Sequence, residues 1–228
     1  MPRRALRLLA LLLGLAPAAV LGQGLDVLAL YGELQVAQPN GFPHYEITAG
    51  RGGARVSGGS VHGSRTRVEV LLDQPHAFLR LVDRGEGEGA PTLVTEVVAW
   101  IDPEGAPLVG LSEWGSRGGV PFGGRLRFYS RLSGRWNLVT AQVWPSLDTP
   151  LCGTPPEDVT EEAAGWDGLG ALVALLPRTG TDVAAWCVGS SPRAGTGAMV
   201  MWERARGVFQ RGAALVGPPS WPLAPSGR

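Results

Sequence analysis

The chain has 228 residues, of which 44% are hydrophobic, and its 20 basic residues balance its 20 acidic residues. This length allows one sizeable hydrophobic core or two small ones. All basic residues are arginine, so lysine-dependent Schiff-base chemistry is excluded, and the near-neutral charge argues against nucleic acid as a partner.

The first 22 residues have the three parts of a secretory signal peptide: a basic start, an apolar run and small residues for cleavage. The apolar run, LRLLALLLGL at 6–15, is about half as long as a membrane-spanning helix. Cleavage after Ala18 or Gly22 fits, and we expect Gly22 because the whole apolar segment is then removed. The sequence therefore predicts export to the periplasm, cell envelope or extracellular space, without a transmembrane span after cleavage. A retained N-terminal anchor is the alternative.

Residues 23–90 form a predicted N-terminal β region, which one interpretation makes a separate small domain. TRVEVLL at 66–72 alternates apolar and charged residues, as a strand with one buried face does. Further strands are expected in three segments, LDVLALYGELQV (25–36), HYEITAG (44–50) and AFLRLVD (77–83). The glycine-rich acidic segment 84–91 is either the boundary of this region or an ordinary hairpin loop.

Residues 91–216 predict a domain of four consecutive β-hairpins. GRLRFYSRL at 124–132 shows the same alternation, and each pair of strand patterns flanks residues suited to a tight reversal. These turn segments are DPEGA, SG, RTGT and AR.

One short helix is expected near residues 155–165, because Thr154 can cap it and prolines follow at its first positions. The tail at 217–228 is proline-rich, so it is either a loose segment or a strap over a sheet. The predicted fold is all-β, an antiparallel sandwich or barrel built from consecutive hairpins. A small β domain followed by an eight-stranded barrel is the second possibility.

The two cysteines predict one disulfide, because paired cysteines in an exported chain are most simply oxidised. Cys152 lies in an expected loop and Cys187 in an expected strand, with Trp186 facing the other side of that strand. Two buried thiols are the alternative. A reactive cysteine is less favoured, since it needs a base and no histidine is near either cysteine in sequence.

The candidate binding surface is WGSRGGVPFGG at 114–124, which we expect to be a long glycine-rich loop. Trp114, Arg117 and Phe122 would present an aromatic ring, a guanidinium and a second ring to a carbohydrate or an envelope component. The alternative is an ordinary connection with a packed tryptophan.

No catalytic, metal-binding or cofactor-binding pattern is expected. The histidines His44, His62 and His76 lack metal-ligand spacing, and the glycine-rich runs lack the spacing of a nucleotide loop. A glycoside hydrolase could still draw two carboxylates from distant strands, and the strand acids to consider are Glu96, Glu113 and Glu203. The sequence thus favours an exported non-catalytic module with a structural or binding role. The alternatives are a secreted hydrolase of this type and a barrel that carries a small ligand.

Overall fold

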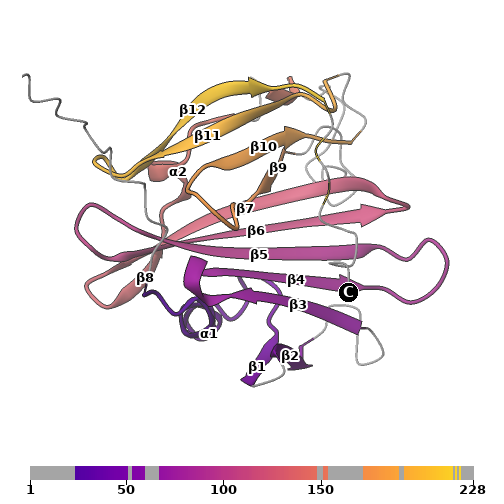
Figure 1. Ribbon diagram of the computed structural model, residues 1–228, viewed down its shortest axis with the longest axis horizontal. Coiled ribbons are helices and arrows are strands. Elements are labelled where there is room, and N and C mark those ends of the chain that lie inside the picture. The colour runs from indigo at the N-terminus through magenta and orange to yellow at the C-terminus, as the bar shows by residue number, and fades with distance from the viewer. Residues whose placement is uncertain are drawn as a thin grey trace, which may run out of the picture.

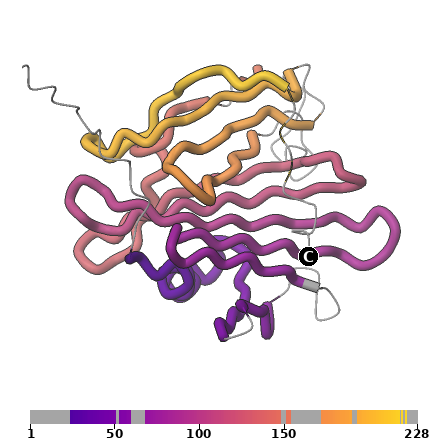
Figure 2. Tube along the Cα trace, viewed as in Figure 1, coloured from indigo at the N-terminus to yellow at the C-terminus, as the bar shows by residue number. Residues whose placement is uncertain are grey.

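Three layers make up the molecule in the computed structural model, which describes residues 24–50, 53–59, 67–147, 151–153, 172–189, 193–217, 219 and 221. A six-stranded sheet lies between a four-stranded sheet and a layer formed by one helix and a two-stranded hairpin (Figure 1). Figure 2 shows that the coloured trace passes through these layers in chain order, from α1 and the hairpin through the six-stranded sheet to the four-stranded sheet. The predicted signal peptide and the helix expected near 155–165 lie outside the described residues.

The first described element is a helix, α1 (Val27–Ala37), so the strand predicted at 25–36 is wrong. Asp26 caps the helix, since its Oδ1 accepts from the backbone N–H groups of Leu28 and Ala29 at 3.1 Å each. Its buried residues recur at helical spacing rather than alternately: Val27, Leu30, Tyr31 and Leu34. That face packs on the six-stranded sheet beside the hairpin of β1 (Glu46–Gly50) and β2 (Gly53–Gly58).

The six-stranded sheet is an antiparallel meander in which each strand pairs with the next along the chain. A 3₁₀ turn, η1 (Gln74–His76), joins its first two strands, and residues 85–91 join the second to the third. The strands are β3 (Arg67–Asp73), β4 (Phe78–Arg84), β5 (Thr92–Ile101), β6 (Pro107–Arg117), β7 (Val120–Leu132) and β8 (Arg135–Leu138).

The four-stranded sheet is also antiparallel, with the order β12-β11-β10-β9. A single helical turn, α2 (Thr140–Val143), follows β8, whose strand ends at Leu138. The strands of the second sheet are β9 (Leu172–Leu175), β10 (Val183–Cys187), β11 (Gly197–Glu203) and β12 (Val208–Leu215).

The predicted all-β, hairpin-built architecture is confirmed, and of its two forms the structure is the sandwich. In the described part of the chain, each sheet has two edge strands and neither closes into a barrel. The main core between the sheets is aromatic: the ring of Phe209 lies 4.8 to 5.4 Å from four other rings, those of Phe128, Trp202, Trp100 and Trp144.

The predicted long loop at 114–124 is wrong, because β6 and β7 run through it and only Gly118 and Gly119 form the turn. Both have positive φ, 58° and 82°, as a two-residue hairpin turn requires. Gly115 and Gly124 are needed for close packing. A Cβ at Gly115 would collide with the ring of Phe122, and one at Gly124 would collide with the backbone carbonyl of Leu172 in β9.

Candidate functional site

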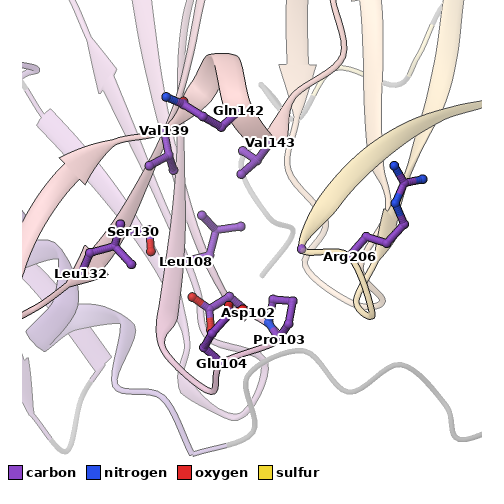
Figure 3. A pocket seen from close by; sticks show the side chains of 11 residues that line it. Asp102, Pro103, Glu104, Leu108, Ser130, Leu132, Val139, Gln142, Val143 and Arg206 are labelled. Carbon is purple, nitrogen blue, oxygen red and sulfur yellow. The ribbon is translucent and has the colours of Figure 1, made fainter.

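A cavity of about 270 Å³ opens at one end of the sandwich, between the two sheets (Figure 3). Three segments line it: the β5–β6 turn with the start of β6, the end of β7 with α2, and the β11–β12 turn. The first and third of these segments contact each other, since a Cβ at Gly207 would lie 2.7 Å from Cδ of Pro103. Gly207 has a φ of 65°, which also favours glycine.

The floor and one wall of the cavity are apolar. Leu108 is 1% exposed and lies at the centre of the group in Figure 3. Val139 and Val143 approach from the α2 segment, and Leu132, which is 53% exposed, stands at the mouth. Leu108, Val139 and Val143 belong to the main core or pack against it, so the cavity is an opening in the hydrophobic interior rather than a hollow in a polar surface.

Four oxygen-bearing side chains line the cavity, and the amide of one of them, Gln142, lies beyond Val139 and Val143 from the other three in Figure 3. Asp102 accepts from the backbone N–H of Ala106 through Oδ1 at 2.7 Å, and among the described residues its Oδ2 has no bond. Glu104 is exposed at the tip of the β5–β6 turn and forms no ion pair in the described part of the chain. Ser130 is only 7% exposed, and its hydroxyl makes no hydrogen bond among the described residues.

The one guanidinium among the lining residues is that of Arg206, and its charge is already matched. Its Nη1 lies 3.3 Å from Oε2 of Glu203, with the side chain 63% exposed. In Figure 3 the guanidinium extends away from Asp102 and Glu104. The carboxylates of the β5–β6 turn therefore face the cavity mouth without a cationic partner.

The binding residues predicted from the sequence lie elsewhere. Trp114 has no exposed surface and packs against the ring of Trp221 from the tail, with ring centroids 5.4 Å apart. Arg117 and Phe122 do contact each other, the guanidinium carbon lying 5.7 Å from the ring centre. The structure thus brings two of the three predicted residues together and places the third in the core.

Of the candidate hydrolase acids, Glu96 is held between the sheets. Its side chain is fully buried, and its Oε1 accepts from Nε and Nη2 of Arg80 at 2.8 and 2.7 Å. Its Oε2 accepts from the backbone N–H of Leu176 at 2.9 Å. Burial raises the pKa of Glu96, and the charge of Arg80 opposes that rise.

Glu96 acts together with Ser112, its cross-strand partner on β6. The Ser112 hydroxyl donates to the carbonyl of Ala174 at 2.6 Å. On β9, the carbonyl of Ala174 and the N–H of Leu176 lie on the edge that β10 does not pair. The two side chains therefore supply the acceptor and the donor that a neighbouring strand would have supplied, and so protect this edge.

Glu113 lies on the opposite face of the six-stranded sheet, because it pairs with Thr95 whereas Glu96 pairs with Ser112. Its Oε2 accepts from Nη1 of Arg127 at 2.9 Å, and burial raises its pKa against the effect of that cation. Glu203 bonds to Arg206 and Gln210. Glu96 and Glu113 thus do not face each other across a cleft, as a hydrolase pair must.

The predicted disulfide between Cys152 and Cys187 is confirmed, with the Cα atoms 5.2 Å apart. Cys187 lies in the main core and Trp186 in another cluster, so their predicted opposite orientations are confirmed. Within the described residues, no three His, Cys, Asp or Glu side chains are grouped closely enough to hold a metal ion. In the same residues, no helix combines the length and apolarity needed to span a membrane.

The sequence does not predict the cavity, because the residues that line it come from three segments far apart in the chain. DPEGA was expected only as a hairpin turn, and nothing in it indicates that the β11–β12 turn will contact Pro103. Comparison with known proteins adds no guide to function: no family model matches the chain, and no curated protein or solved structure is significantly similar to it.

Proposed function

We propose that the chain is an exported, non-catalytic β-sandwich module that binds a component of the envelope or extracellular space through the cavity at the end of the sandwich. One observation carries this proposal: an opening into the hydrophobic core bordered by Ser130, Asp102 and Glu104, each of which has at least one side-chain oxygen without a partner among the described residues. Binding sites are typically apolar hollows with a few polar groups that fix orientation. The hydroxyl of Ser130, a residue that is 7% exposed, is such a group.

Two features support export. The N-terminal residues have the pattern of a signal peptide, and the Cys152–Cys187 disulfide suits an oxidising compartment. Mass spectrometry of the exported protein should find a chain that begins at Gln23 with both cysteines oxidised. A product that stays inside the cell with residues 1–22 attached would overturn the export proposal.

The alternatives fit the geometry less well. A glycoside hydrolase needs two facing carboxylates, whereas Glu96 and Glu113 are bonded to arginines on opposite faces of one sheet. A carrier needs an enclosed cavity, and this one is open, with a volume slightly below the roughly 300–1,000 Å³ of small-molecule sites.

The binding proposal is tested by mapping backbone amide shifts while a fragment library is titrated into the protein. We expect the largest shifts around Leu108, Ser130 and Val143. Leu132→Trp, which fills the mouth, should abolish them. Leu138→Trp is the matched control, because Leu138 is similarly exposed, at 57% against 53%, and does not line the cavity. If the largest chemical-shift changes instead occur around Arg117 and Phe122, the binding site lies there and not at the cavity.

A further inference from the structure

The chemical nature of the ligand follows from the polar groups around the cavity, provided that the cavity is the binding site proposed above. Apart from the amide of Gln142 and the paired guanidinium of Arg206, three groups border the apolar floor, and all three can accept a hydrogen bond: Oγ of Ser130, Oδ2 of Asp102 and the carboxylate of Glu104. Two of the three are negatively charged. The cavity therefore favours a ligand that brings both a positive charge and several hydrogen-bond donors.

We propose that the cavity binds a primary alkylammonium group on an unbranched apolar stem. An ammonium carries three N–H donors in a compact, strongly hydrated head, which matches three separate acceptors. Its stem of methylene groups would lie on Leu108, Val139 and Val143, while the head stays at the polar border near the mouth. The lysine side chain has this chemistry, and so does a free alkylamine.

A guanidinium fits the cavity less well. Its five donors are fixed in a plane and suit a carboxylate that can accept two of them side by side. One oxygen of Asp102 is already bonded to the N–H of Ala106, so that carboxylate has a single free oxygen to offer. Ser130, on β7, likewise supplies one oxygen. The exposed Glu104 keeps both oxygens free and could accept a guanidinium side by side, so the preference for an ammonium rests on Asp102 and Ser130, whose separate single oxygens match rotatable donors better than a rigid fork.

The rest of the cavity does not supply this charge from within. Arg206 is paired with Glu203 and extends away from the β5–β6 turn (Figure 3). The sequence contains no lysine, so a second copy of the chain cannot offer a lysine side chain either. We therefore take the source to be a lysine in a partner peptide, with a free alkylamine as the other source of the same group.

The test uses the whole mature protein and two probes that differ only in the ammonium. Nα-acetyl-lysine N-methylamide and its norleucine counterpart have the same stem, and n-butylamine represents the free amine. Binding is followed by amide shifts of the cavity residues and by calorimetry. We expect the lysine compound to bind at least tenfold more tightly than the norleucine compound, a difference that corresponds to about 1.4 kcal/mol.

Two variants assign the charge to its residues. Glu104→Gln should weaken the lysine compound about three- to tenfold and leave the norleucine compound unchanged. Ser130→Ala should also weaken the lysine compound selectively. Glu88→Gln is the matched control, since Glu88 is likewise exposed in a β-hairpin turn but is not a lining residue, and it should change nothing.

The outcomes separate the two proposals. Equal affinity for both lysine and norleucine compounds would overturn the ammonium inference while leaving the cavity as a binding site. No shift at the cavity with any probe, together with a failed fragment titration, would overturn both. If n-butylamine binds as tightly as the lysine compound, the inference stands and the source is a free amine. If only the lysine compound binds, the source is a peptide.

Discussion

Replacing Ser112 with alanine removes one hydroxyl from between the sheets and almost preserves the shape of the side chain. Ser112 is 1% exposed, and its hydroxyl is bonded to the carbonyl of Ala174 at 2.6 Å. Without it, the carbonyl stays buried and loses its partner, which costs about 1–3 kcal/mol. Since about 1 kcal/mol lowers the Tm of a chain of this size by roughly 2–4 °C, Ser112→Ala should melt about 2–12 °C below the wild type.

The matched control is Ser116→Ala, measured by thermal and urea denaturation in the same buffer. Ser116 lies on the same strand and is 3% exposed, and within the described residues its hydroxyl has no hydrogen bond. Its replacement should leave the Tm within about 1 °C of the wild type. Equal melting temperatures for the two variants would refute the view that Ser112 protects the free edge of β9.

Glu96→Gln extends the same reasoning to the other half of this contact. The amide oxygen can accept from only one side, so either Leu176 or Arg80 loses its acceptor, and the guanidinium loses its counter-charge. Removal of one member of a buried ion pair costs about 3–5 kcal/mol, and we expect the lower end because Arg80 is 20% exposed. If Glu96→Gln lowers the free energy of unfolding less than Ser112→Ala does, the ion pair with Arg80 is not part of the contact that protects the edge of β9.

The remaining predictions concern glycines, the disulfide and pH. Gly124→Ala should strongly destabilise the folded protein, because the new Cβ would collide with the backbone of β9. Gly32→Ala, which has open space around it in α1, should instead raise the free energy of unfolding by about 0.5–1 kcal/mol. Melting temperatures that shift in the same direction for both variants would contradict this. The disulfide joins residues separated by 35 positions in the sequence, and its reduction should lower the free energy of unfolding by about 4 kcal/mol. Equal midpoints of urea denaturation with and without reductant would refute this prediction. Burial raises the pKa of Glu113 above its usual value of 4.5. The protonated form of Glu113 therefore contributes fully to stability below pH 4.5, and this contribution is lost as the pH rises through the pKa of Glu113 in the folded protein. Glu113→Gln should remove this part of the dependence of unfolding free energy on pH. An unchanged pH dependence would show that Glu113 is not responsible for it.

The hairpins could be predicted from the sequence because their signals are local. Alternation in GRLRFYSRL and turn residues such as DPEGA act over a few positions, and neither depends on distant contacts. The segment before β1 was misassigned because a short apolar run fits both helix and strand. Its leucine and alanine content and the capping position of Asp26 favoured the helix that the structure shows.

The segment at 114–124 shows a different kind of failure. Its glycines predict a long loop, whereas in the structure Gly115 and Gly124 lie in strands, and Phe122 and Leu172 leave no room there for a side chain. The sequence shows that a position has no side chain, but the reason depends on which strands cross above it. The cavity depends on the same information, because the packing of one sheet on the other brings its three turns together.

These observations give a physical reason for the position of the cavity. Along β9 the sheets come close together: Gly124 leaves no room between β7 and the backbone of β9, and Ser112 reaches the β9 carbonyl directly. In the main core, large rings hold the sheets apart, with Phe209 against Trp100 and Phe128. At the end where the β5–β6 and β11–β12 turns meet, the apolar side chains that line the cavity are leucine, valine and one proline, which are too small to continue that aromatic layer. The sandwich is therefore open at the end where the side chains between the sheets become smaller. The apolar stem of a ligand bound there would extend the layer of aromatic rings between the two sheets.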